Sequence, residues 1–100
     1  MEYEHIIMSL IVHGGNARSN CLKALELAQN GDMIQAETLF KSVDEDINKA
    51  HEIQTKLIQA EINGEKNEIS LLLIHAQDHL MNAMTVRDLA LMMFKWIKNN

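Results

Sequence analysis

The sequence predicts an all-α fold, an antiparallel up-down-up bundle of three long helices, in a single domain spanning residues 1–100. Proline is absent and glycine occurs only four times, so few residues interrupt helices. Hydrophobic residues make up 47% of the chain, which is enough for a folded core, whereas aromatic residues reach only 4%. A β-sandwich or barrel would need turn residues and β-rich segments every ten or so positions, and these are missing.

Two short segments rich in Asn and Gly set the helix boundaries. In Asn30-Gly31-Asp32, Gly31 suits the left-handed position that ends a helix, and Asp32 can cap the next one. Gln35 follows Asp32 at the spacing of a capping box. Residues 63–67, Asn-Gly-Glu-Lys-Asn, form the second predicted turn. We therefore expect helices over roughly 4–29, 33–62 and 68–98, each about 40 Å long at 1.5 Å per residue.

Charge and cysteine content restrict the possible functions. The net charge is −5, from 9 basic and 14 acidic residues, which disfavours a nucleic-acid-binding surface. No apolar run approaches the roughly 20 residues of a membrane span. The single cysteine, Cys21, excludes an intrachain disulfide, and its place on an apolar stripe with Ala17 and Ala28 predicts a buried, inert thiol. The acidic start Met1-Glu2-Tyr3-Glu4 is unlike a secretory signal, so we expect a cytoplasmic protein.

The third helix has more apolar surface than one bundle can cover. At 100° per residue, one apolar face contains Leu73, Leu80, Met84 and Leu91. The opposite face contains Leu71, Leu72, Val86, Leu89, Ala90, Met93 and Ile97. A second apolar face needs a partner, and another copy of the chain is the simplest one. We therefore expect a homo-oligomer with the third helix at its centre.

Polar side chains interrupt the second face at its middle. His75, Asp78, His79 and Asn82 are spaced so that they neighbour one another on the helix surface. Polar groups in an apolar surface cost stability unless they are paired, and such a cost is typical of a functional site. Folding the chain at its two turns sets Gln54 opposite Gln77 and Asp78.

The same folding brings further histidines to this level. His13 and His51 come within about a turn of it, which predicts a mid-bundle layer holding four of the five histidines. Gly14-Gly15 lies beside His13 inside the first helix, where each glycine costs about 1 kcal/mol relative to alanine. We interpret the two glycines as a bend or as a close approach of another backbone or a ligand.

Three chemical interpretations of this cluster remain open from spacing alone. It could be a structural polar layer. It could bind a metal ion through the two histidines and the carboxylate, although Ala76 stands where the zinc-protease pattern requires glutamate and a third strong ligand is not evident. It could also supply an imidazole nucleophile for phosphoryl transfer, with the neighbouring histidine donating hydrogen bonds to the phosphoryl oxygens.

A longer motif surrounds these residues. The run His75-Ala76-Gln77-Asp78-His79-Leu80-Met81 resembles the signature of lactose/cellobiose enzyme IIA components of the bacterial phosphoenolpyruvate-dependent sugar phosphotransferase system. Other similar segments, in order, are Gly14-Gly15-Asn16-Ala17-Arg18-Ser19, Asn30-Gly31-Asp32 with Ala36-Glu37, and Ala50-His51 with Gln54-Thr55. The resemblance covers nearly the whole chain and favours the nucleophile.

The resemblance implies a homotrimeric phosphocarrier. His75 would accept a phosphoryl group from the histidine-containing phosphocarrier protein and pass it to a cysteine of the cognate IIB component during disaccharide uptake. His79 would donate a hydrogen bond to that group, and Gln77 belongs to the same motif. Asp78 would lie near the trimer axis, where three carboxylates repel one another unless a cation intervenes, and oxygen ligands suit Mg²⁺ better than zinc. The alternative is a trimeric helical scaffold, or a metal-binding regulatory protein, that keeps the motif without the transfer.

Overall fold

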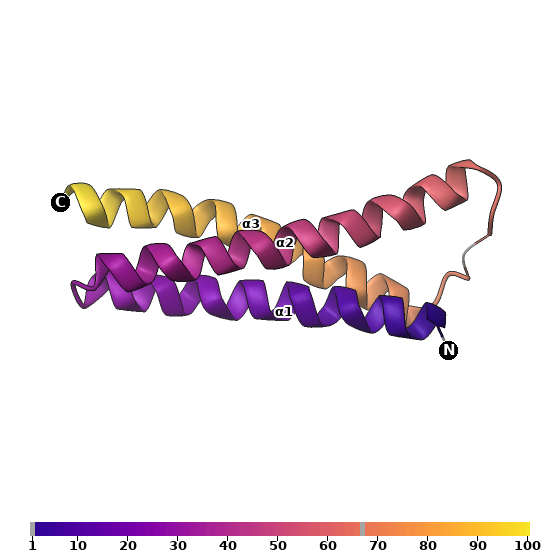
Figure 1. Cartoon of the computed structure of the whole chain (residues 1–100), viewed down its shortest axis with the longest axis horizontal. Coiled ribbons are helices and arrows are strands. Elements are labelled where there is room, and N and C mark those ends of the chain that lie inside the picture. Colours follow the sequence, from indigo (N-terminus) through magenta and orange to yellow (C-terminus); the bar gives the residue numbers. More distant parts are fainter. Residues whose placement is uncertain (1, 67) are drawn as a thin grey trace.

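The chain folds into three long helices connected by two short loops (Figure 1). The computed structural model describes residues 2–66 and 68–100, with helices α1 (Glu2–Gln29), α2 (Met33–Ile62) and α3 (Leu71–Asn99). α1 and α3 run in the same direction and α2 runs back between them in sequence, within an elongated shape of 51 × 22 × 19 Å. The predicted all-α, up-down-up bundle is confirmed. In the described part of the chain, no helix has the length and apolarity needed to cross a membrane.

The helix ends follow local capping chemistry. Gly31 has φ of 91°, and the Asp32 side chain accepts a hydrogen bond of 3.1 Å from the backbone N–H of Gln35, as predicted. The predicted start of the third helix at residue 68 is wrong. α3 begins at Leu71 because Ser70, in an extended conformation, caps it by accepting a 3.1 Å hydrogen bond from the Leu73 N–H. Asn67, which we assigned to the second turn, lies outside the described residues.

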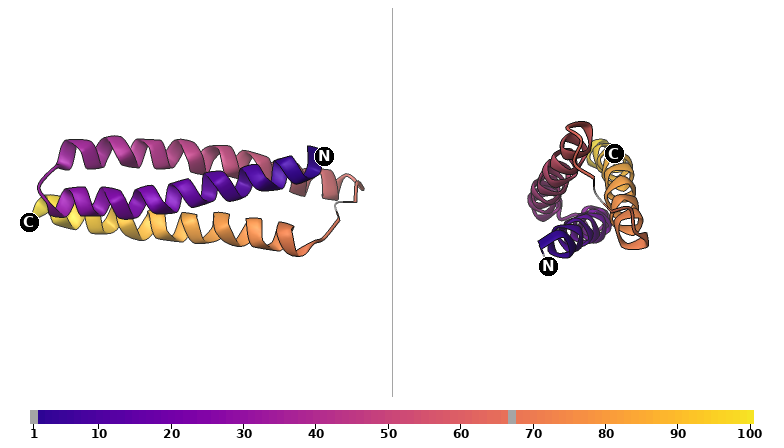
Figure 2. Two further views of the ribbon diagram at one scale, coloured as in Figure 1. Left: turned by 90° about the horizontal axis from the view of Figure 1, so that it is seen from below. Right: turned by 90° about the vertical axis from the view of Figure 1, so that its right-hand side faces the viewer.

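Small side chains on α1 form the centre of the bundle. Ala17, Cys21, Ala24 and Ala28 are all buried on one face of this helix. α1 contacts both other helices along its length, whereas α2 and α3 touch each other much less (Figure 2). Between these last two helices, the rings of Phe40 and Phe94 pack with their centroids 5.2 Å apart. α1 is therefore the helix that positions α3.

The predicted faces of α3 need correction. Leu80 is buried as expected, but Leu91, assigned to the inner face, is 36% exposed. Ala90, assigned to the outer face, is buried, and Val86 and Ile97 pack partly against the core. The inner face is centred on Ala76, Leu80, Ala83, Ala90 and Phe94. The reason is that α3 lies against the small residues of α1, so its own small residues point inward and several larger ones point out.

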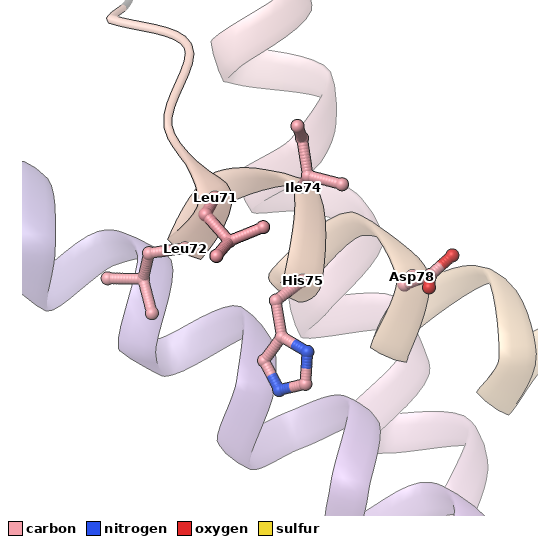
Figure 3. A pocket seen from close by; sticks show the side chains of 5 residues that line it. All are labelled: Leu71, Leu72, Ile74, His75 and Asp78. Atoms are coloured by element: carbon pink, nitrogen blue, oxygen red, sulfur yellow. The ribbon is translucent and has the colours of Figure 1, made fainter.

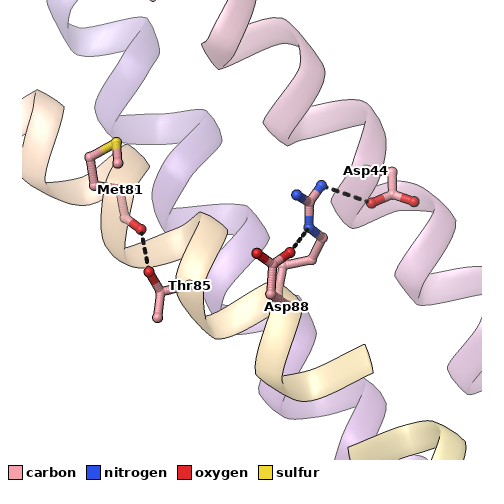
Figure 4. Close-up of polar contacts among 5 residues, drawn as sticks. Asp44, Met81, Thr85 and Asp88 are labelled. Carbon is pink, nitrogen blue, oxygen red and sulfur yellow. Dashed lines mark hydrogen bonds and ion pairs between the residues drawn. The ribbon is translucent and has the colours of Figure 1, made fainter. Parts of the chain in front are cut away.

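The outer face of α3 is exposed along the whole helix. It consists of Leu71, Ile74, Asp78, Met81, Thr85, Leu89, Met92 and Trp96. Leu71 is 83% exposed and Trp96 72%. The Thr85 hydroxyl on this face donates to the carbonyl of Met81 (Figure 4). The expectation of an uncovered apolar face on the third helix is thus confirmed, although several of its members differ from those predicted.

Ion pairs connect the halves of α2 and α3 that lie far from the second loop. Arg87 contacts Asp44 of α2 at 3.3 Å and Asp88 at 3.1 Å (Figure 4). Nearer the C-terminus, Lys98 donates to Glu37 of α2 at 2.7 Å, and this lysine lowers the pKa of the Glu37 carboxyl. Exposed pairs of this kind stabilise little, so they contribute little to the packing of α2 on α3.

Candidate active site on helix α3

Gly14 brings α1 unusually close to α3. A Cβ atom at this position would lie 3.2 Å from the carbonyl carbon of His79 and 3.3 Å from its Cβ and carbonyl oxygen. The two glycines were expected to mark either a bend or a close approach, and for Gly14 the close approach of another backbone is confirmed. A Cβ at Gly15 would meet nothing within 4 Å. The contact fixes the height at which His79 lies against α1.

His75 and His79 form a pair of imidazoles in direct contact. Their Nε2 atoms are 3.1 Å apart, and the rings meet edge to face with centroids 4.5 Å apart. The four-residue spacing places them one above the other on α3. A hydrogen bond between two Nε2 atoms requires a proton on one and a lone pair on the other. The pair therefore holds one nitrogen ready to act as a nucleophile and a neighbour ready to donate a proton in a hydrogen bond.

The predicted layer of four histidines does not form. The Nδ1 atom of His13 lies 2.7 Å from the Asp46 carboxylate on α2, and His51 is exposed. The level of these residues along the bundle axis was predicted well. However, α2 faces α1 more than α3, so an α2 side chain at this level, Asp46, pairs with α1. Gln54 of α2 is the exception, since its amide donates a hydrogen bond to the side-chain oxygen of Gln77, as the folding of the chain predicted.

A cavity of about 140 Å³ opens beside the histidine pair, and we call it the histidine pocket. Arg18, His75, Asp78, His79 and Asn82 line it. The four polar residues that interrupt the apolar face of the third helix are therefore together, as predicted. Gln77 is not among the lining residues, because it lies on the side of α3 that faces α2.

An apolar depression adjoins the pocket at the start of α3. Its volume is about 590 Å³, and Leu71, Leu72, Ile74, His75 and Asp78 line it (Figure 3). In Figure 3 the His75 ring points toward α1, whereas the Asp78 carboxylate points to another side of α3. His75 thus lies where a polar pocket meets an apolar surface.

One chain supplies few ligands for a metal ion. The part of the chain that the structure describes has no group of three or more His, Cys, Asp or Glu side chains placed to hold one. Asp78 is a single exposed carboxylate on the outer face of α3.

Comparison with known proteins agrees with the geometry of the site. Residues 5–98 match the family described as "PTS system, Lactose/Cellobiose specific IIA subunit". The chain belongs to this family of the phosphotransferase system. The lichenan-specific phosphotransferase enzyme IIA component of Bacillus subtilis is 52% identical over 89 residues, which are 89% of this chain and 81% of that protein.

Two solved IIA structures have the same fold. The cellobiose-specific enzyme IIA of Bacillus anthracis has a TM-score of 0.94 and 49% identity, over 99% of this chain and 91% of that one. The chitobiose IIA of Escherichia coli, solved in a complex with HPr, has a TM-score of 0.84 and 36% identity, over 99% of this chain and 96% of that one. The resemblance noted in the sequence is confirmed, and as a IIA subunit the chain is a phosphotransferase component.

Arg18 is the residue of this site that sequence reasoning did not single out. It occurs in the segment Gly14–Ser19, which we used only to support the resemblance. A signal was present, because Arg18 follows Gly14 by one helical turn and so lies on the same side of α1. Recognising it required knowing that Gly14 touches the backbone of His79.

Proposed function

We propose that this IIA subunit carries a phosphoryl group on His75, accepting it from HPr, the histidine-containing phosphocarrier protein. It then passes the group to a cysteine of the cognate IIB component for disaccharide uptake. The observation that carries the proposal is the 3.1 Å contact between the Nε2 atoms of His75 and His79. Family membership adds support, as does the fold shared with a IIA protein solved together with HPr.

The chemistry requires only the two imidazoles. With the proton of the pair on His79 Nε2, the Nε2 of His75 has a lone pair, which attacks phosphorus in line when the His79 N–H turns away from it. The bond from phosphorus to the donor's ring nitrogen breaks, and its electron pair stays on that nitrogen. The His79 N–H donates instead to a phosphoryl oxygen, so the same donor serves the free site and the loaded one. Gln77 contributes indirectly, because its bond to Gln54 fixes the rotation of α3 against α2.

Acceptance of the phosphoryl group can be tested by intact-mass spectrometry under mildly alkaline conditions, which preserve phosphohistidine. The chain is incubated with phosphoenolpyruvate, enzyme I and HPr. We expect one phosphoryl group per chain in wild type and in His51→Ala, an exposed histidine outside the pocket that serves as the matched control. We expect none in His75→Ala and slower loading in His79→Ala. A wild-type chain that stays unmodified beside phosphorylated HPr would favour the scaffold hypothesis.

We also propose that three chains assemble through the outer face of α3. Its residues recur at spacings of three and four, which is the pattern of helices that pack along a common axis. Exposed apolar side chains as large as Met92 (70%) and Trp96 (72%) support this proposal. Light scattering after gel filtration should give three times the chain mass. A monomer at micromolar concentration would contradict the assembly.

Asp78 is the polar interruption of this face and our proposed site for Mg²⁺. Three Asp78 carboxylates meeting on an axis would repel one another, and a hard cation bound by oxygen atoms removes that repulsion. The ion would be structural. Chelation should therefore lower the unfolding temperature of wild type but not that of Asp78→Asn, with the exposed Asp88→Asn as control. Equal effects in all three proteins would contradict the site.

The phosphocarrier role and the lone reduced Cys21 support a cytoplasmic location.

A further inference from the structure

Arg18 is a cation beside the histidine pair, and its charge is not paired within the described part of the bundle. The guanidinium forms no hydrogen bond or ion pair with any residue in the described ranges. Arg87 offers a contrast, since it contacts both Asp44 and Asp88. Arginine in a folded protein is always charged, so an unused guanidinium on a pocket wall is suited to binding an anion.

The position of Arg18 follows from the contact between α1 and α3. Gly14 sets α1 against the backbone of His79, and Arg18 lies one turn further along the same side of α1. Because α1 and α3 run in the same direction, one turn along α1 corresponds to one turn beyond His79, near Asn82. Arg18 and Asn82 accordingly line the histidine pocket together. The glycine therefore has a second consequence, which is to place a guanidinium at the pocket wall.

A phosphoryl group on His75 would need such a cation. It adds a charge of about −1.5 to −2 at neutral pH, as phosphate monoesters on side chains do. Asp78 is among the residues that line the same pocket, and the chain already has a net charge of −5. The His79 N–H can supply a hydrogen bond, whereas an arginine also supplies a permanent charge. Among the described residues that line the pocket and the adjoining depression, Arg18 is the one cation.

The pocket also has room for the group. Its volume of about 140 Å³ is roughly ten times the 10–15 Å³ that one water needs, enough for a phosphorus atom with three oxygens. A guanidinium can donate two parallel hydrogen bonds to neighbouring phosphoryl oxygens. We propose that Arg18 binds the phosphoryl group carried on His75 and is the main charge that stabilises it. This inference rests on the proposed function and names a further residue of the same site.

The test measures, by intact mass, the equilibrium of phosphoryl exchange between phosphorylated HPr and this chain. Arg18→Gln should lower the equilibrium constant for loading by roughly 3- to 10-fold, the range for losing a charge-assisted hydrogen bond at a partly exposed site. Arg18→Lys keeps the charge without the planar fork, so it should recover part of that loss. Lys23→Gln removes the same charge from an exposed position on α1 and should behave as wild type. Added salt should weaken loading of wild type more than that of Arg18→Gln.

The outcomes separate this inference from the function on which it rests. A wild-type chain that accepts no phosphoryl group overturns the proposed function and the role of Arg18 with it. A wild type that loads normally while Arg18→Gln and Lys23→Gln load equally well overturns the role of Arg18 alone. A structural role would instead lower the urea midpoint or change the oligomeric state of unphosphorylated Arg18→Gln. Such a change, matching the loss of loading, would also overturn the inference.

Discussion

Substituting Gly14 and Gly15 separately by alanine tests the contact that positions the site. The two glycines are adjacent on α1, and both gain about 1 kcal/mol of helix propensity when replaced by alanine. They differ in what the new methyl group meets. At Gly15 it meets nothing within 4 Å, whereas at Gly14 it lies 3.2 Å from the carbonyl carbon of His79. The difference in stability between the variants therefore measures the packing contact.

The magnitude follows from the geometry. The atoms nearest to the new Cβ at Gly14 are the backbone carbon and oxygen of His79 and its Cβ, which cannot rotate away as the end of a side chain can. Relief requires α1 and α3 to separate by a few tenths of an ångström, which loosens the alanine contacts on both sides. Adding a methyl group to a well-packed interface costs about 1–3 kcal/mol. Gly14→Ala should thus be less stable than Gly15→Ala by about 1–3 kcal/mol.

Urea unfolding followed by circular dichroism, at one fixed protein concentration, measures this difference. Gly15→Ala should be more stable than wild type by about 1 kcal/mol. Gly14→Ala should also load phosphoryl groups more slowly, because the displaced backbone carries His79. If Gly14→Ala is as stable as Gly15→Ala, the close approach does not constrain the bundle and the reasoning is refuted.

Further outcomes at three positions test the core and the helix ends. Burial raises the pKa of the Cys21 thiol from 9.0 to about 11. Iodoacetamide should therefore alkylate Cys21 only after the chain unfolds. Rapid labelling of the folded protein would contradict the burial. Because the pKa of this thiol is higher in the folded chain than in the unfolded one, its contribution to the free energy of unfolding is present below pH 9 and is lost as the pH rises toward 11. Cys21→Ser should remove this loss. Asp32→Ala should cost about 1 kcal/mol in urea unfolding through the lost cap of α2, and an unchanged midpoint would contradict it. Phe94→Ala should cost about 3 kcal/mol by removing the ring packed against Phe40, whereas a cost under 1 kcal/mol would show that the ring is dispensable.

Local features of the fold were predictable because local chemistry determines them. The cap of Asp32 on Gln35 and the left-handed Gly31 depend on a few consecutive residues, and the structure has both. The start of α3 was missed for an equally local reason, since Ser70 is a good cap that the helix prediction passed over. The spacing of His75 and His79 sufficed to predict that their rings are neighbours.

Features that depend on which helix packs against which were harder to predict. Hydrophobic periodicity identified two faces of α3 but placed Ala90 on the wrong one, because size complementarity with α1 determines which face is buried. The layer of four histidines was predicted for the same reason, because the sequence does not show which helices face each other. In the structure His13 pairs with Asp46 instead. Arg18 was overlooked because its partner surface belongs to a helix more than fifty residues away in the sequence.

The most direct test of the phosphocarrier account is onward transfer from the loaded protein. Phosphorylated wild-type chain is separated from HPr and mixed with its IIB component, and the masses of both proteins are followed. The account predicts that the chain loses one phosphoryl group while IIB gains one, and that replacing the acceptor cysteine of IIB abolishes this exchange. If the phosphoryl group stays on the chain, or is lost to water without appearing on IIB, His75 is not the carrier that we propose.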